Sequence, residues 1–207
     1  MADTTVTAQT VVDSSIARAK DPYKTQWTDA QLLIFLNKAY DYAHKILIQA
    51  KSELVITSVQ VTMAATREYS LADHLPDFWG MVENGVYFTT TPLTPVTVED
   101  AKRYGTTTTT VAPTAYYLTG THLGMLQTPT DAAVGVAPYL TCRYYKKNTA
   151  LTLASTMPYK NLLNEPMSSF MDHLAVLKTT APTEELTAIY NALEESALAL
   201  AVKRSPL

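Results

Sequence analysis

Apolar residues between positions 27 and 51 recur at the spacing of one helical face, and the start of this helix is fully specified by its own residues. Thr28 is followed three residues later by Gln31, the pattern of a capping box in which each side chain bonds the other residue's backbone N–H. Trp27 and Leu32 occupy the two positions of a hydrophobic staple. The sequence therefore predicts a helix over residues 29–51 whose buried stripe contains Leu32, Leu33, Phe35, Leu36, Ala39, Tyr40, Ala43, Ile46 and Leu47.

Three further segments have helical periodicity. Residues 5–20 are weakly amphipathic and stop before Asp21-Pro22. A later helix over residues 165–178 is predicted to be capped by Asn164 and to bury Met167, Phe170, Met171, Leu174 and Leu177. The last helix is predicted to be capped by Thr183 and to bury Leu186, Ile189, Tyr190, Leu193, Ala197, Leu200 and Ala201.

The middle of the chain changes to the period of two that is typical of strands. Strands are predicted at residues 54–63, 81–89 and 139–145, and a tight hairpin at 115–119 and 122–126 around Gly120-Thr121. The connections predict a short helix at 98–104 closed by Gly105, an exposed loop tip at the threonine run 106–110, and a turn at 128–131.

This order of elements predicts an α+β chain, mainly a helical bundle of two N-terminal and two C-terminal helices with an inserted antiparallel β-rich region. We interpret the 207 residues as a single domain, with N-terminal helices in 1–53, the β-rich insertion in 54–147, and C-terminal helices and tail in 148–207. A charged fraction of 17% and a formal net charge of −3 are ordinary for a globular protein and give no indication of nucleic-acid binding. The chain lacks a long apolar run and a secretory pattern at residues 1–5, so we expect a protein made in the cytoplasm with no membrane partner.

The residues offer little that predicts chemistry. Cys142 is the single cysteine and shares one strand face with Leu140 and Tyr144, so we interpret it as a small buried hydrophobe. The four histidines are far apart in sequence, and Asp172 beside His173 is interpreted as solvated helix surface. Six glycines without a phosphate-binding motif give no support for nucleotide binding. We therefore expect no catalytic residues, no metal and no cofactor.

Two groups of residues are candidates for protein contacts. Tyrosines are concentrated at Tyr116, Tyr117, Tyr144 and Tyr145, and aromatic residues of this kind either pack a sheet or form an interface between proteins. The cluster Arg143-Tyr144-Tyr145-Lys146-Lys147 has the same two interpretations, with base stacking as a further alternative. After the last helix, Lys203 and Arg204 compensate the helix dipole or begin a docking tail that also contains Ser205, Pro206 and Leu207.

Taken together, the chain resembles the head-to-tail adaptor, or head completion, proteins of tailed bacteriophages. The similarity is carried by four parts: the helix entry WTDAQLL with LNKAY (residues 27–40), the turn LPDF (75–78), the strand entry PTAYYL (113–118), and the Tyr144-Tyr145 strand before the C-terminal helices. The chain departs from the family pattern in the middle region, where Ala72-Asp73-His74 separates the tyrosine strand from the Leu-Pro turn.

The resemblance implies a structural protein of the virion, located at the head-tail junction, and no catalysis. It implies a ring of about twelve copies that binds the portal, often through its C-terminal end, presents a platform to tail or tail-nozzle proteins, and lets DNA pass non-specifically through its lumen. The alternatives are another virion ring, such as a tail terminator or a tail tube protein, a small enzyme with an unrecognised site, or a binding module unrelated to viruses.

Overall fold

The computed structural model describes residues 6–18, 26–63, 66–103, 108–109, 112–129, 139–159, 162–180 and 183–202. Contacts divide the chain into two compact units. The helical unit contains Met1–Val55 and Asn148–Leu207, and the β unit contains Ile56–Lys147. The predicted α+β fold is confirmed, because helices and sheets are segregated along the chain.

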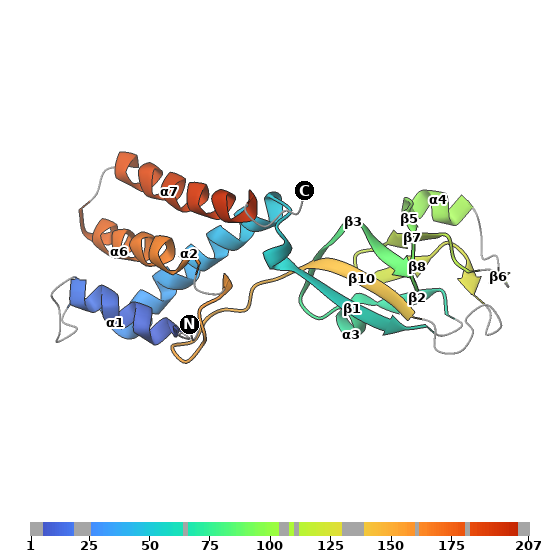
Figure 1. The fold of residues 1–207 in the computed structure, drawn as a ribbon, viewed down its shortest axis with the longest axis horizontal. Helices are drawn as coiled ribbons and strands as arrows, with labels where there is room; N and C mark the ends of the chain where they lie inside the picture. The colour runs from blue at the N-terminus through green and yellow to red at the C-terminus, as the bar shows by residue number, and fades with distance from the viewer. Residues whose placement is uncertain are drawn as a thin grey trace. The chain divides into compact units, whose positions relative to one another are not determined.

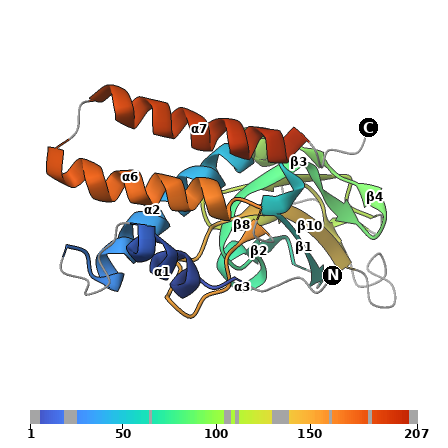
Figure 2. The same ribbon diagram turned by 60° about the vertical axis from the view of Figure 1, so that its left-hand side comes forward.

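In its described residues the helical unit contains four α-helices, and a short 3-10 turn, η1 (Glu53–Val55), closes its first part. The helices are α1 (Ala8–Arg18), α2 (Asp29–Gln49), α6 (Asn164–Thr180) and α7 (Thr183–Val202). Figure 1 and Figure 2 show α6 and α7 running side by side in opposite directions, with α2 behind them. Helix α2 contacts each of the other three helices, so its apolar stripe forms the centre of this unit.

The predicted capping box at the start of α2 is confirmed. The backbone N–H of Gln31 donates to the Thr28 hydroxyl at 3.3 Å, and the Thr28 N–H donates to the Gln31 side-chain oxygen at 3.0 Å. The Trp27 ring packs edge to face against Phe35, with ring centroids 5.7 Å apart. This aromatic contact holds the chain where it enters the helix, and the hydrophobic staple between Trp27 and Leu32 stays a prediction.

The helical cores follow the predicted stripes with some corrections. In α2 every residue of the predicted stripe is buried except Leu33, which is half-buried, while the buried His44 was not expected in the stripe. In α6 Met167, Phe170 and Met171 are buried but Leu174 is half-buried, and in α7 Ile189 and Tyr190 are half-buried. Asn164 and Thr183, predicted as caps, are the first residues of their helices. The Leu177 and Leu186 side chains lie outside the described part.

The β unit contains two four-stranded sheets and one two-stranded pair. The first sheet has the order β1-β10-β3-β4, and its strands are β1 (Ile56–Thr62), β10 (Tyr139–Lys146), β3 (Phe78–Phe88) and β4 (Thr91–Pro92). The second has the order β2-β8-β7-β5, and its strands are β2 (Glu68–Ser70), β8 (His122–Met125), β7 (Ala115–Leu118) and β5 (Thr94–Pro95). The short helices α3 (Leu71–His74) and α4 (Val98–Arg103) complete the unit (Figure 1).

Strand β10 is the central strand of the first sheet. Leu140, Cys142 and Tyr144 point to one face and are at most 1% exposed, which confirms the predicted alternation. They join a core with Val61 and Val86 from the neighbouring strands, and with Tyr116 and Leu123 from the second sheet. The two sheets therefore share one apolar interior.

The predicted hairpin is confirmed, because β7 and β8 pair in antiparallel register from Tyr116 with Met125 to Leu118 with Leu123. The β unit is not wholly antiparallel, since β5 pairs with β7 in parallel. The predicted turn at Thr128-Pro129 is wrong: these residues form strand β9 (Thr128–Pro129), parallel to β6 (Thr108–Thr109). The predicted loop tip at the threonine run is also wrong at Thr108 and Thr109, which form β6. The rest of the run, and Gly105, lie outside the described residues.

The capping box gives a stability prediction. Replacing Thr28 with alanine removes the acceptor for the Gln31 N–H, so we expect the free energy of unfolding to fall by about 1 kcal/mol. The matched control is Thr28→Ser, which keeps a hydroxyl acceptor. Its free energy of unfolding should lie within about 0.3 kcal/mol of the wild-type value. Urea denaturation followed by circular dichroism measures both, and equal losses in the two variants would contradict the capping role.

Candidate interaction surfaces

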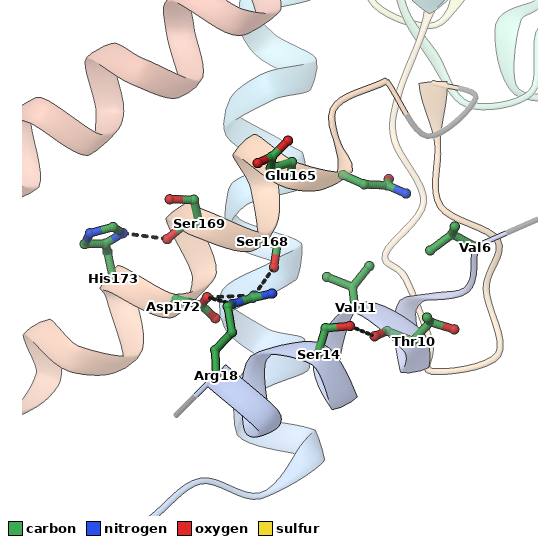
Figure 3. A pocket seen from close by; sticks show the side chains of 11 residues that line it. Val6, Thr10, Val11, Ser14, Arg18, Glu165, Ser168, Ser169, Asp172 and His173 are labelled. Atoms are coloured by element: carbon green, nitrogen blue, oxygen red, sulfur yellow. Dashed lines mark hydrogen bonds and ion pairs between the residues drawn. The ribbon is translucent and has the colours of Figure 1, made fainter. Parts of the chain in front are cut away.

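A polar clamp joins the first helix of the chain to a helix about 150 residues later (Figure 3). We define it by Ser15 and Arg18 on α1 and Ser168 and Asp172 on α6. The Arg18 Nε donates to the Asp172 Oδ2 at 2.7 Å, and the Arg18 Nη2 lies 2.7 Å from the same oxygen. The Ser15 hydroxyl donates to the other carboxylate oxygen, and the Arg18 Nη2 also donates to the Ser168 hydroxyl.

The clamp unites an exposed charge with buried hydroxyls. Ser15 is 4% exposed and Ser168 is 8% exposed, while half of the Arg18 side chain is open to solvent. A buried hydroxyl without a partner is costly, so these bonds favour one register of α1 on α6. The expectation that Asp172 is merely solvated surface is wrong, because its carboxylate bonds Ser15 and Arg18 of α1. No local sequence pattern links positions 18 and 172.

The clamp lies in an open groove of about 520 Å³ between α1 and α6. Figure 3 shows Val6 and Val11 on one side of this groove and Ser169 and His173 on the other. Two polar side chains within it are bonded to the backbone of their own helix: the His173 Nδ1 lies 2.7 Å from the Ser169 carbonyl, and the Ser14 hydroxyl donates to the Thr10 carbonyl. Such an arrangement can receive another molecule's surface, and it offers no activated serine.

A second groove, of about 480 Å³, lies on the other side of α6, against α7. Its floor is apolar and includes Phe170, Ile189 and Leu193. Glu165, Ser169 and His173 border both grooves, so they form a ridge along the outer side of α6. Exposed apolar side chains occur elsewhere in this unit at Ile34 (57%), Leu162 (47%) and Leu198 (40%), and features of this kind are typical of protein contact surfaces.

The four tyrosines singled out from the sequence lie mostly inside the β unit. Tyr116 and Tyr117 are each 4% exposed and Tyr144 is 1% exposed, whereas Tyr145 is half-buried on the opposite face of β10. The Tyr144 hydroxyl donates to the Pro76 carbonyl at 2.9 Å, which ties β10 to the turn before β3. An interface role for this group stays a prediction, and it rests on Tyr145.

Tyr117 shows how closely the second sheet is built around an aromatic ring. Its hydroxyl donates to the Glu68 carboxylate at 2.7 Å, and the Arg67 guanidinium lies 5.6 Å from the ring centroid. Burial, followed by the hydrogen bond to Glu68, raises the pKa of Tyr117 above its usual value. A Cβ at Gly124 would lie 2.1 Å from the Tyr117 ring, so only glycine fits opposite it.

The interpretation of Cys142 as a buried hydrophobe is confirmed. Its side chain is 0% exposed, and burial raises the pKa of the thiol to about 12. A thiol with a pKa in this range stays protonated at neutral pH, so it is not an activated nucleophile.

The histidines are not brought together. His44 is buried in the helical unit, and its Nδ1 lies 2.6 Å from the Tyr159 hydroxyl, whose pKa is raised by burial. The Tyr40 ring packs edge to face against Tyr159, so this cluster connects α2 to the segment before α6. Within the described ranges, no three His, Cys, Asp or Glu side chains form a group that could hold a metal ion. No helix in the same ranges is long and apolar enough to cross a membrane.

The described residues thus form a helical unit with a groove on either side of α6, and a β unit with one apolar interior. A family model described as SU10 adaptor protein matches residues 6–206, which is nearly the whole chain and includes both units. The chain therefore belongs to the SU10 adaptor protein family, and the predicted resemblance to phage head-to-tail adaptors is confirmed. A comparison with curated protein sequences finds no match.

Sequence reasoning missed the clamp and both grooves. The signal for the clamp is weak: Ser15 lies one residue before the buried Ile16, and Asp172 one residue after the buried Met171. Polar residues at the margin of an apolar stripe indicate a helix-helix boundary, but they do not identify the partner. The tail residues Lys203, Arg204, Ser205, Pro206 and Leu207 lie outside the described residues.

The clamp predicts a specific loss of stability. Replacing Asp172 with alanine leaves the Ser15 hydroxyl buried without its acceptor, so we expect the free energy of unfolding to fall by about 1–3 kcal/mol. Hydrogen exchange should also increase in α1, since the helix loses its polar attachment to α6. The control is His173→Ala, an exposed neighbour that should stay within about 0.5 kcal/mol of wild type. Indistinguishable denaturation curves for the two variants would show that the clamp contributes nothing.

The raised pKa of Cys142 predicts a thiol that is unreactive in the folded protein. Because its pKa lies near 12, only about one molecule in 10⁴ carries a thiolate at pH 8, and that sulfur is also inaccessible. We expect no reaction with a colorimetric disulfide reagent at pH 8 and one thiol per chain after unfolding in guanidinium. Ser58→Cys adds an exposed thiol as a positive control. Rapid labelling of the folded wild type would contradict the burial of Cys142.

Proposed function

We propose that the protein forms a ring at the head-tail junction of a phage particle, where it joins the portal to tail proteins and encloses the path of the DNA. The observation that carries this proposal is the family match over residues 6–206, since adaptor is the function that the family description names. The protein is a structural component of the virion in this proposal, and its role needs no catalytic step.

A closed ring needs two different surfaces on each copy, because every copy contacts its neighbours head to tail. On the helical unit, candidate contact surfaces are the grooves on either side of α6 and the exposed side chains of Ile34 and Leu198. On the β unit, Tyr145 and Trp79 present aromatic surface, and Trp79 is 53% exposed. Aromatic side chains that are partly exposed are favourable anchors for protein interfaces.

Attachment to the portal is assigned to the C-terminal residues Lys203, Arg204, Ser205, Pro206 and Leu207. They follow α7, and the proposal assigns the two cations, Lys203 and Arg204, to contacts with a partner. A short tail of this kind can bind in an extended conformation, with Leu207 as an apolar anchor and Lys203 and Arg204 contacting acidic groups.

The charge of the chain suits a channel through which DNA slides. Each copy carries a formal net charge of −3, so a ring of many copies has an acidic character overall. Phosphate groups are bound mainly by clusters of Lys and Arg, and an acidic wall limits such contacts. The DNA is therefore expected to pass without being retained.

The decisive experiment mixes the purified protein with its cognate portal and images the product by electron microscopy. The proposal predicts an added ring, of about twelve copies, on the narrow end of the portal. A ring that assembles on tail tubes and never on the portal would instead identify a tail terminator or tail tube protein. A protein that stays monomeric with the portal in excess would overturn the ring assignment.

Portal attachment gives a prediction for the tail. Deleting residues 203–207 should weaken attachment to the portal by at least about tenfold, since each lost charge-assisted contact or apolar anchor contributes about 1 kcal/mol or more. The matched control, Lys203→Arg with Arg204→Lys, keeps both charges and should attach like the wild type. Circular dichroism tests that α7 is retained. Unchanged attachment of the truncated protein would remove the docking role of these residues.

A further inference from the structure

Strand β1 forms an edge of the first sheet that is unusually open. Within the described residues it pairs with β10 on one side and with no strand on the other. Its register with β10 is continuous from Ile56 opposite Tyr145 to Thr62 opposite Tyr139, without a bulge. Its sequence, ITSVQVT, contains no charge and no proline, and five of its seven residues are β-branched (Ile, Val or Thr), the type favoured in strands.

The terminal strands β4, β5 and β2 of the two four-stranded sheets have the protection that natural proteins normally use. Strands β4 and β5 are two residues long and end in Pro92 and Pro95, and β2 has three residues and begins with Glu68. Proline, charge and short length all prevent an edge strand from pairing with another chain. A seven-residue edge without any of these features indicates a strand that is covered in the assembled state.

The opposite margin of the same sheet is also open over part of its length. Strand β4 pairs only with Tyr87 and Phe88, so the earlier part of β3, from Phe78 to Val82, has β10 as its single neighbour in the described structure. Trp79, which is 53% exposed, lies in this open part. An exposed tryptophan beside an unpaired strand segment is a second indication of a contact surface.

The two open segments run in the same direction, because β1 and β3 are each antiparallel to β10. Neighbours in a wide ring differ by a small rotation, so strand direction is nearly the same in adjacent copies. The open segment of β3 in one copy can therefore meet β1 of the next copy in a parallel ladder. These are two different surfaces on opposite margins of one sheet, which is what a head-to-tail contact requires.

We infer that β1 of each copy pairs with the Phe78–Val82 segment of β3 in the neighbouring copy, so that the first sheet continues from subunit to subunit. This inference rests on the ring assembly proposed above. The occupant of the β1 edge is a second copy of this chain.

The side chains on the two segments are compatible with this pairing. On the core side, the half-buried Val59 of β1 would be covered by Phe78 or Met81, which are also only partly buried in one copy. On the outer side, the exposed Ser58 and Gln60 would lie beside Trp79 and Gly80. Apolar residues therefore face apolar residues, and uncharged polar residues face an aromatic ring and open space.

Cysteine crosslinking tests the inference, because the native Cys142 is buried and does not compete. Gly80 lies opposite Tyr145 on the outer face, and a Cβ at this position has no heavy atom within 4 Å. Gly80→Cys is combined in turn with Ser58→Cys, Gln60→Cys and Thr62→Cys, which sample the exposed positions of β1. Rings assembled on the portal are treated with a mild oxidant and separated on a denaturing gel.

The expected result is a ladder of multimers, up to the full ring, for at least one of the three pairs. The ladder should disappear on reduction, and each single-cysteine variant should remain monomeric on the gel. Disulfide formation requires Cα atoms roughly 4.4–6.8 Å apart, so only directly opposed strand positions give efficient closure.

Three other outcomes overturn the inference, and they differ in whether the proposed function is also rejected. Dimers from a single β1 cysteine would show two-fold pairing of β1 with itself. Intact rings without a ladder for any pair would place the ring contact elsewhere and leave the proposed function standing. If no ring forms on the portal with the wild-type chain, the proposed function fails, and the inference fails with it.

Discussion

The buried stripe of α2 is the feature on which the helical unit depends. Helices α1, α6 and α7 each contact α2, and its residues Leu36, Ala39, Ala43 and Leu47 are completely buried. Burial of apolar surface gives this packing its strength but little direction, because apolar contacts tolerate sliding and rotation. The clamp of Ser15, Arg18, Ser168 and Asp172 adds direction, since its buried hydroxyls have their partners in one register of α1 on α6.

The β unit has a well-buried central strand, β10, and less protected strands at its edges. Strand β10 has a neighbour on both sides, and its inner residues are among the most buried in the chain. Here the polar groups that are buried remain neutral, since burial raises the pKa of Cys142, Tyr116 and Tyr144. The interior of the unit therefore does not change its charge near neutral pH.

Periodic and local features were predictable from the sequence, and long-range pairings were not. The Thr28–Gln31 capping box, the α2 stripe, the β7–β8 hairpin and the inner face of β10 depend on residues that are close in sequence. The pairing of Arg18 with Asp172, and the parallel pairing of β6 with β9, depend on how distant segments meet. The tyrosines show the same limit: the sequence left sheet packing and an interface as alternatives, and three of the four lie in the core, because period-two alternation does not say which sheet faces are covered.

An open strand edge is hard to predict from a sequence, because it depends on which strands become neighbours in the sheet. The run ITSVQVT predicts a strand at once, yet nothing within it distinguishes a central strand from an edge. Only the strand order shows that β1 is an edge strand, and that β4 covers only Tyr87 and Phe88 on its side of β3. A chain that kept such an edge exposed in its final state would risk uncontrolled association through it. In the ring that we propose, each β1 edge is covered by the next copy, and closure of the ring leaves no edge free for further association.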